Sequence, residues 1–110
     1  MTKLENKHIS KITPIISPID LKNQFPIQSP LSDFVINSRN TISNIATKKD
    51  SRKLVIIGPC SIHDPAAALE YAKRLSEYVE KFKDKLYIVM RVYFEKPRTN
   101  IGWKGLISDP

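Results

Sequence analysis

Two segments of the chain carry the side chains best suited to chemistry. Cys60 stands in a Gly-Pro-Cys-Ser turn soon after an apolar run, and a thiolate in such a turn is able to ligate a divalent transition metal. A second apolar run leads into Arg91, Lys96, Arg98 and Thr99. Arginine and lysine bind phosphate and carboxylate groups through charge-assisted hydrogen bonds. Together the two segments suit a metal ion beside a bound anion.

Each of these side chains also has a purely structural interpretation. A cysteine outside a disulfide is often a small, half-buried filler. His63 completes a Cys-x-x-His spacing, but the one other histidine is His8, so an ordinary loop histidine also explains it. We expect Arg91 within a strand, its guanidinium toward the interior, where it needs either a salt bridge or a bound anion. On the residues alone both interpretations stay open.

The pattern around these residues predicts one strand–helix–strand unit. Residues 53–58 form a continuous β-branched run typical of a parallel strand buried on both faces, and residues 86–94 form the second strand. Asp64 and Pro65 mark the start of a helix over residues 65–83. The expected core face of this helix consists of Ala68, Ala72, Leu75, Val79 and Phe82. Because parallel strands end at one edge of their sheet, we expect the thiol and the cations to meet there.

The first part of the chain predicts an arm and two helices. Four of the eight prolines fall within the first thirty residues, which favours an extended arm. Ser17 is the expected N-cap of a short helix that begins at Pro18 and ends near Gln24. Ser29 and the proline after it repeat this start signal, for a helix that reaches about Thr47.

Length and charge narrow the classes of function. With 110 residues, of which 41% are hydrophobic, the chain has room for one small domain with a modest core. The net charge of +7 is concentrated in residues 1–53, which have nine Lys/Arg against four Asp/Glu. This part lacks interleaved aromatic residues and tight cation runs, so we expect a solvated or subunit-contacting arm and no nucleic-acid partner. A basic module that binds anionic polymers stays as an alternative.

Cysteine content and hydropathy point to a cytoplasmic protein. A single cysteine forms no intramolecular disulfide and suits a reducing compartment. No run of about 18 apolar residues occurs, which predicts no membrane span and no membrane partner. The N-terminus lacks the apolar region of a secretory signal. Walker A, Rossmann glycine and nucleophile-elbow motifs are also missing, so the two segments above carry the chemistry.

Two long motifs are distinctive enough to suggest a family. They are Gly-Pro-Cys-Ser-Ile-His-Asp-Pro at residues 58–65 and Met-Arg-Val-Tyr-Phe-Glu-Lys-Pro-Arg-Thr at residues 90–99, followed by Gly-Trp-Lys-Gly-Leu-Ile. The chain thereby resembles the N-terminal portion of the type I 3-deoxy-D-arabino-heptulosonate-7-phosphate (DAHP) synthases, also called phospho-2-dehydro-3-deoxyheptonate aldolases. The likeness is strong from Leu54 to Pro110 and weaker before it.

The resemblance implies an α/β fold, the N-terminal portion of a (β/α)8 TIM barrel with an N-terminal extension arm and helix. The extension would cover residues 1–53, with oligomer or regulatory contacts, and the first two βα regions residues 54–110. The implied reaction condenses phosphoenolpyruvate with D-erythrose 4-phosphate to DAHP and phosphate, the first step of the shikimate pathway to chorismate and aromatic amino acids. A divalent metal cation, such as Mn, Fe, Co or Zn, is required and polarises the aldehyde.

The family motif also implies roles for single residues. Cys60 corresponds to a metal ligand, and Lys96 to a catalytic residue near the aldehyde substrate. The implied substrate-binding residues are Arg91, Lys96, Pro97, Arg98 and Thr99. Of these, Arg91 and Lys96 match positions that contact phosphoenolpyruvate, and the Lys-Pro-Arg-Thr motif resembles the erythrose 4-phosphate site. Metal ligation is not carried over to His63, because the family's metal-binding histidine lies much later.

Two departures from the family pattern bear on activity. Asn100 stands where a second threonine is common, which is a mild variation. The chain also stops after the second βα region, so the family's later His, Glu and Asp metal ligands have no counterpart in it. We therefore expect these residues to be inactive alone. A non-catalytic remnant or interaction fragment of the enzyme is the alternative.

The family implies partners besides the two substrates. Its members are homo-oligomers, dimers or tetramers, in which the arm reaches a neighbouring subunit and helps to form a site for an aromatic amino-acid inhibitor. The arm of this chain does not identify the inhibitor. We expect the overall likeness to be greatest to tyrosine- or phenylalanine-regulated members.

Overall fold

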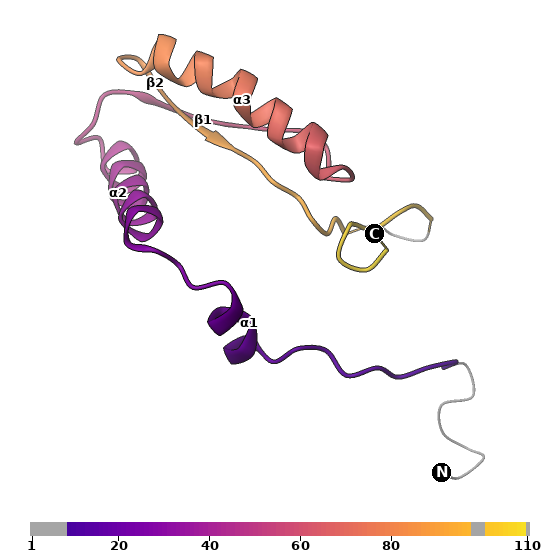
Figure 1. The fold of residues 1–110 in the computed structure, drawn as a ribbon. Helices are drawn as coiled ribbons and strands as arrows, with labels where there is room; N and C mark the ends of the chain where they lie inside the picture. The colour runs from indigo at the N-terminus through magenta and orange to yellow at the C-terminus, as the bar shows by residue number, and fades with distance from the viewer. Residues whose placement is uncertain (1–8, 98–100, 110) are drawn as a thin grey trace. The chain divides into compact units, whose positions relative to one another are not determined.

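The computed structural model describes residues 9–97 and 101–109, which form an α/β arrangement of helices and strands (Figure 1). The elements are α1 (Pro18–Gln24), α2 (Ser29–Ala46), β1 (Lys53–Ile57), α3 (Pro65–Phe82) and β2 (Leu86–Met90). The chain divides into two compact units, the first ending at Ile36 and the second beginning at Asn37, so the division falls within α2. Among the described helices, none is long and apolar enough to cross a membrane.

Local side-chain chemistry accounts for α1. Ser17 is its N-cap, with Oγ accepting the backbone N–H of Asp20 at 3.2 Å. Pro18 fills the first helical position, where a missing N–H costs nothing. The N–H of Phe25 donates to the carbonyl of Leu21 at 2.9 Å and closes the last turn. The predicted start and end of this helix are confirmed.

The second helix, α2, begins one residue earlier than the Ser-Pro signal predicts. The carbonyl of Gln28 accepts the N–H of Ser32 at 3.1 Å, so Gln28 rather than Ser29 stands at the N-cap position. Ser29 instead donates its hydroxyl to the carboxylate of Asp33 at 3.2 Å. Beyond the far end, Lys48 takes a φ of 61°, a left-handed conformation that cannot continue a helix.

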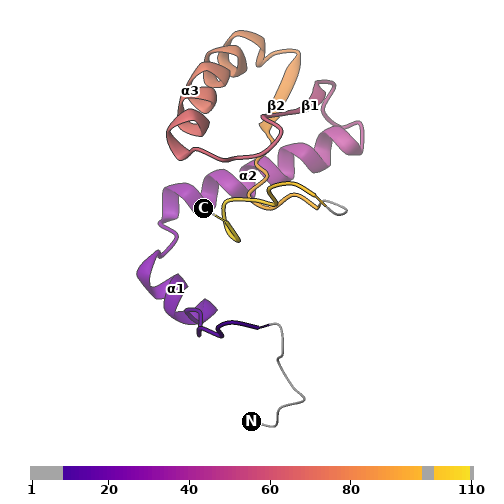
Figure 2. The same cartoon turned by 90° about the vertical axis from the view of Figure 1, so that its right-hand side faces the viewer.

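In the second unit, β1 and β2 pair in parallel, as predicted. The register runs from Lys53 opposite Leu86 to Ile57 opposite Met90. Helix α3 connects the strands and packs along the sheet (Figures 1 and 2). The carboxyl ends of both strands therefore lie at one edge, where the sequence places the thiol and the cations.

The second strand is shorter than predicted, because it ends at Met90 and not at residue 94. The N–H of Arg91 still donates to the carbonyl of Ile57 at 2.8 Å. Beyond that bond the segment that follows β1 is Gly58-Pro59, and a proline has no N–H to continue the hydrogen bonds between the strands. Arg91 therefore lies just past the strand rather than inside it.

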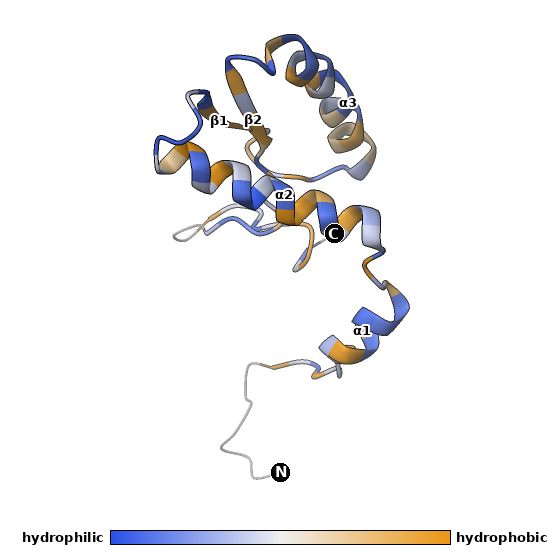
Figure 3. Ribbon diagram, turned by 90° about the vertical axis from the view of Figure 1, so that its left-hand side faces the viewer, coloured by the Kyte–Doolittle hydropathy of each residue, from blue (hydrophilic) through white to orange (hydrophobic). Residues whose placement is uncertain are grey.

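The core is smaller than the apolar strands predict. Ile62, at 3% exposed, is the one buried apolar residue in the described part of the chain. Ile56 in β1 is 64% exposed, and all of β2 is half-buried. The prediction that residues 53–58 form a strand buried on both faces is therefore wrong, since apolar residues of β1 (Figure 3) remain exposed.

Helix α3 follows its predicted bounds closely. Asp64 is the N-cap, with its carboxylate accepting the N–H of Ala66 at 2.8 Å, and Pro65 opens the helix. Within the predicted core face, the half-buried residues are Ala68, Ala72 and Leu75, and the exposed ones are Val79 and Phe82. Phe82 is exposed because it borders an open groove, which is described below.

Candidate active site

Cys60 lies in the loop between β1 and α3, at the edge where both strands end. The side chain is exposed, and the Nζ of Lys96 donates a hydrogen bond to its Sγ at 2.8 Å. The sulfur of a cysteine is a donor that binds metal ions in its thiolate form. The structure therefore brings the predicted thiol and one predicted cation into direct contact.

Arg91 directs its guanidinium toward the loop that carries Cys60. Its Nη2 donates to the carbonyls of Gly58 at 3.2 Å and Pro59 at 3.0 Å. The guanidinium carbon also lies 5.3 Å from the centre of the Tyr93 ring, a cation–π contact. The carbonyls and the ring carry no net charge, so they do not neutralise the guanidinium as a carboxylate would. We call Cys60, Arg91 and Lys96 the strand-end corner.

The expected interior position of Arg91 is wrong. The residue is exposed, so it does not project into the interior, because β2 ends one residue before it. It also makes no salt bridge within the part of the chain that the structure describes. The charge that the sequence expects to be buried instead lies at an open edge, where an anion from solution is able to reach it.

Lys96 is held by two short antiparallel segments, residues 94–96 and 104–106, which we call the brace. The N–H of Lys96 donates to the carbonyl of Lys104 at 2.7 Å. A second backbone bond, from residue 106 to residue 94, measures 2.9 Å. Hydrogen bonds of the brace therefore hold the backbone of Lys96, while its side chain contacts Cys60.

Glu95 and Gly105 form the centre of the brace, and sequence reasoning missed this role for both. They pair in an antiparallel bridge, and the Glu95 carboxylate accepts the N–H of Ser108 at 2.7 Å. The indole N–H of Trp103 donates to the carbonyl of Asp109 at 2.6 Å. A glycine nine residues after a strand-end lysine was the one available signal, and by itself it indicates only a turn.

The other residues of the Lys-Pro-Arg-Thr motif are only partly described. Pro97 is exposed and follows Lys96 directly. Arg98 and Thr99, together with Asn100, lie outside the described residues. Of the predicted cluster of three cations, the structure therefore describes Arg91 and Lys96 at the strand-end corner.

The described residues do not complete a metal site. A bound zinc ion, for example, needs about four ligands. In the ranges 9–97 and 101–109, no three His, Cys, Asp or Glu side chains lie close enough to hold an ion. His63 is exposed and borders a small hollow of about 150 Å³ beside the start of α3. Cys60 thus offers one donor of suitable chemistry.

The opposite end of the sheet holds a different charged group, which we call the Arg52 clasp. The Nη2 of Arg52 lies 2.6 Å from the Oδ2 of Asp50, and its Nη1 donates to the carbonyl of Lys83 at 3.4 Å. Its guanidinium carbon also lies 5.2 Å from the centre of the Tyr87 ring. The hydrogen bond between the two side chains lowers the pKa of Asp50 and raises the pKa of Arg52. This neutralised pair was not predicted, although Asp-x-Arg directly before a strand is visible in the sequence.

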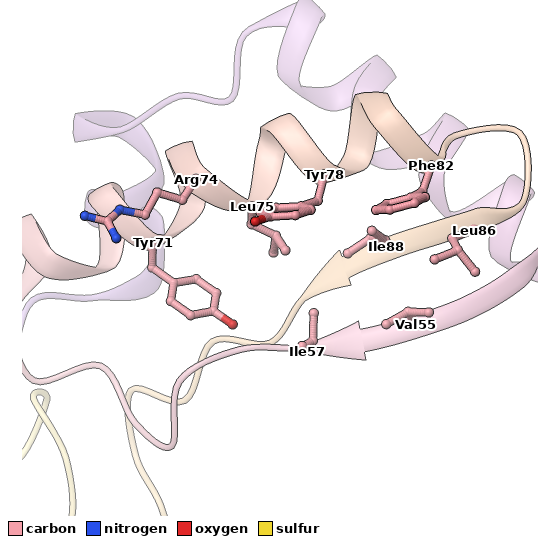
Figure 4. A pocket seen from close by; sticks show the side chains of 9 residues that line it. All are labelled: Val55, Ile57, Tyr71, Arg74, Leu75, Tyr78, Phe82, Leu86 and Ile88. Carbon is pink, nitrogen blue, oxygen red and sulfur yellow. The ribbon is translucent and has the colours of Figure 1, made fainter.

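An apolar groove of about 490 Å³ lies between α3 and the sheet. Its lining, drawn in Figure 4, consists of Val55, Ile57, Tyr71, Arg74, Leu75, Tyr78, Phe82, Leu86 and Ile88. The rings of Tyr78 and Phe82 stack with centres 6.4 Å apart. None of the three residues of the strand-end corner lines the groove, so it is a packing surface and not part of the candidate active site.

Comparisons with known proteins match most of the chain to one enzyme family. The model of the DAHP synthetase I family matches residues 17–110. The Trp-sensitive phospho-2-dehydro-3-deoxyheptonate aldolase of Buchnera aphidicola subsp. Acyrthosiphon pisum is 54% identical over 110 residues, which are 100% of this chain and 32% of that protein. The Phe-sensitive aldolase of Escherichia coli K12 is 51% identical over 106 residues, 96% of this chain and 30% of that protein.

A solved structure agrees with these matches. The phospho-2-dehydro-3-deoxyheptonate aldolase of Francisella tularensis SCHU S4 superposes with a TM-score of 0.86 at 51% identity, over 93% of this chain and 30% of that one. The chain thus spans about a third of the length of the relatives it matches. The expected preference for tyrosine- or phenylalanine-regulated members is wrong, since the Trp-sensitive relative is 54% identical and the Tyr- and Phe-sensitive relatives of Escherichia coli are 50% and 51%.

Proposed function

The chain belongs to the DAHP synthetase I family, and on this premise we propose that its residues serve the condensation of phosphoenolpyruvate with D-erythrose 4-phosphate to DAHP and phosphate, the first step of the shikimate pathway. The observation that carries the proposal is the strand-end corner, where the Nζ of Lys96 lies 2.8 Å from the Sγ of Cys60. The relatives named phospho-2-dehydro-3-deoxyheptonate aldolase support it.

The charges of the corner fit the proposed substrates. Both substrates carry phosphate, and phosphoenolpyruvate adds a carboxylate, so their site needs fixed cations that are not already neutralised. A guanidinium has five N–H donors, and the carbonyl bonds of Arg91 use only its Nη2. The remaining donors of Arg91 are therefore available to phosphoenolpyruvate, and the ammonium of Lys96 adds a second positive charge.

Lys96 is the proposed catalytic residue. As the enol carbon attacks the aldehyde, negative charge develops on the aldehyde oxygen, and a fixed ammonium nearby stabilises it. The brace supplies the fixed backbone that this role requires. Binding of erythrose 4-phosphate is proposed for Pro97, Arg98 and Thr99, the last two of which lie outside the described residues.

A divalent metal cation is the proposed cofactor, with Cys60 as one ligand. Thiolate sulfur suits the softer divalent metals, and the exposed position of Cys60 leaves it accessible to an ion. When bound, the metal supplies Lewis-acid chemistry. Because the described residues contribute no cluster of three donors, the other ligands would come from residues beyond those described.

The remaining features of the family are proposed for the whole protein. Parallel strands joined by α3 support the first two βα units of a (β/α)8 barrel preceded by an extension over residues 1–53. Relatives named Trp-, Tyr- and Phe-sensitive support feedback inhibition by an aromatic amino acid. We also propose a homo-oligomer and a cytoplasmic location, where reducing conditions keep the thiol of Cys60 intact.

A chimera tests the proposed reaction. The chain replaces the matching segment of the Phe-sensitive Escherichia coli relative, and phosphoenolpyruvate consumption is followed in the presence of D-erythrose 4-phosphate and Mn²⁺. We expect the chimera to turn over and the Lys96→Met version to lose at least about 100-fold in kcat, since an interaction with developing charge contributes on this scale. A folded chimera whose activity is the same with and without Lys96 would reject the proposal.

The alternative function, a non-catalytic interaction fragment, is favoured by the open apolar groove beside α3. Assaying the chain alone does not distinguish the two, because one sulfur donor cannot hold a catalytic metal well and both functions therefore predict an inactive chain. We expect no turnover from the chain alone. The fragment alternative gains support if the chimera is also inactive although it folds and binds phosphoenolpyruvate.

A further inference from the structure

We infer that Gly105 is a positioning residue for Lys96, acting through the brace. Its importance for catalysis rests on the proposed function, whereas its effect on Lys96 does not. Gly105 is buried, and a Cβ at this position would overlap the carbonyl oxygen of Phe94 and lie 2.7 Å from the Cα of Glu95. Only a glycine allows two backbones to approach this closely.

The close approach controls the hydrogen bonds of the brace. The bond of 2.7 Å from Lys96 to Lys104 and the bond of 2.9 Å from residue 106 to residue 94 flank the bridge between Glu95 and Gly105. Room for a methyl group at residue 105 requires the two segments to separate, and an N–H···O distance beyond about 3.5 Å is no longer a hydrogen bond. An alanine would therefore open the brace on both sides of the bridge.

An open brace releases the residue that contacts the thiol. A lysine side chain has four rotatable bonds and loses up to about 2 kcal/mol of conformational entropy when it is held in one place. The fixed backbone at Lys96 keeps that loss as small as possible for an ammonium 2.8 Å from Cys60. Backbone freedom at residue 96 adds further conformations, most of which place the ammonium elsewhere.

A second contact ties the brace from the other side. The carboxylate of Glu95 accepts the N–H of Ser108 at 2.7 Å, and the N–H of Asp109 donates to the carbonyl of Gly105 at 3.0 Å. These two bonds close the turn that follows Gly105. Glu95 therefore provides a way to loosen the brace without adding any atom at residue 105.

The charge selectivity of Cys60 alkylation measures where the ammonium is. The chain has one cysteine, so alkylation reports on Cys60 alone. Iodoacetate and iodoacetamide both react with the thiolate, and the ratio of their rates at one pH therefore cancels the thiolate fraction. A nearby ammonium attracts the anionic reagent and raises the ratio roughly threefold to fivefold at low salt. Lys96→Gln gives the baseline without the ammonium.

We expect Gly105→Ala to lower the ratio to near the Lys96→Gln value while the helix content, measured by circular dichroism, is retained. Ser108→Ala is the matched control within the brace, because it keeps the backbone N–H that Glu95 accepts, and it should keep the wild-type ratio. A wild-type ratio in a folded Gly105→Ala variant would overturn the inference.

Glu95 variants decide the question if Gly105→Ala does not fold. Glu95→Gln keeps an oxygen acceptor for Ser108, whereas Glu95→Ala removes it. Loss of a nearby negative charge by itself raises the ratio in both variants. We expect Glu95→Ala to fall below the wild type and Glu95→Gln to stay at or above it. A rise in both variants would show that the brace does not position Lys96.

The alkylation assay uses neither substrate nor metal, so it fails or succeeds independently of the proposed function. In the chimera, Gly105→Ala should lower kcat about tenfold or more, since small misplacements of catalytic groups cost this much or more. If Gly105→Ala alters the alkylation ratio but the folded chimera without this substitution is inactive, the proposed function is rejected and the positioning role stands. If Gly105→Ala leaves the ratio unaltered and the chimera without this substitution is active, the positioning role is rejected and the proposed function stands.

Discussion

The two ends of the β1–β2 sheet treat positive charge in opposite ways. At the amino ends, Arg52 lies 2.6 Å from the carboxylate of Asp50 and is neutralised. At the carboxyl ends, Arg91 donates to two carbonyls and Lys96 to a sulfur, and neither has an ion-pair partner in the described part of the chain. Similar residue types are thus used for stability at one end and left available at the other.

The difference indicates where an anion binds. A neutralised pair in contact with water contributes little to stability and offers nothing to a ligand. Arg91 donates to neutral carbonyls, so it keeps its charge and remains attractive to phosphate and carboxylate. The charge pattern therefore points to the same edge of the sheet that strand topology indicates for ligand binding.

The largest effect is expected from Cys60→Ser in the chimera. A hydroxyl is a much poorer ligand for soft divalent metals than a thiolate. We therefore expect kcat to fall at least about 100-fold, which is more than changes to residues that contact only a metal ligand produce. With Co²⁺ in place of the native metal, the sulfur-to-cobalt charge-transfer absorption should also disappear. Glu77→Ala, on the exposed side of α3, is the control. Unchanged absorption in Cys60→Ser would mean that the sulfur is not a ligand.

Arg91→Lys tests the open end of the sheet with the charge kept. Lysine cannot bond both the carbonyls of the β1 loop and an anion, and a charge-assisted hydrogen bond contributes about 1.5–3 kcal/mol. We expect the KM for phosphoenolpyruvate in the chimera to rise roughly 10- to 100-fold. Arg74→Lys, in an exposed ion pair on α3, is the matched control and should leave KM unchanged. Equal effects of both variants would remove the distinction between the two kinds of arginine.

Gly58→Ala tests how closely the two carboxyl ends must approach. A Cβ here would overlap the carbonyl oxygen of Arg91 and lie 3.0 Å from two further backbone atoms of that residue. We expect the free energy of unfolding of the chain to fall by about 1–3 kcal/mol, as for other overpacked sites. Urea denaturation followed by circular dichroism measures this. Ser51→Ala, in the exposed segment before β1, should have no comparable effect.

Asp50→Asn tests the neutralised end and should have the smallest effect. The pKa of Asp50 is lowered in the folded protein by its hydrogen bond from Arg52, below an ordinary value of 3.8. The stability that the carboxylate contributes is therefore present in full above about pH 4 and is lost as the pH falls through the folded pKa. Wild type and variant should differ slightly in urea midpoint at pH 7 and converge in acid. A difference that grows in acid would contradict this assignment.

Local rules predicted the helices well and the core poorly. Ser17 and Asp64 are N-caps because a side-chain oxygen satisfies an N–H two or three residues later, which a short stretch of sequence determines. The end of β2 depends instead on the neighbouring strand, which reaches Pro59 and has no N–H to offer. Burial of Ile56, which is 64% exposed, depends on which elements cover the strand, and the residues of the strand itself do not determine that.

The candidate site divides in the same way. Side-by-side strand ends and a parallel pair followed from the βαβ pattern, and they bring Cys60 near Lys96. The direction of the Arg91 side chain could not be predicted, because it depends on two carbonyls contributed by the other strand's loop. The brace escaped prediction since the sequence between its two segments has no recognisable hairpin pattern.

The parallel register has a consequence for how the chain folds. Each pair from Lys53–Leu86 to Ile57–Met90 is separated by the same 33 positions, 86 minus 53 and 90 minus 57. No pair lies close together in the sequence, as the first pair of a β-hairpin does. The first pair to form therefore costs the full loss of conformational entropy for closing the loop between the strands. Prior formation of α3 shortens the loop to be closed. We therefore expect the helix to form before the sheet, which makes its capped N-terminus at Asp64 a determinant of folding rate as well as of stability.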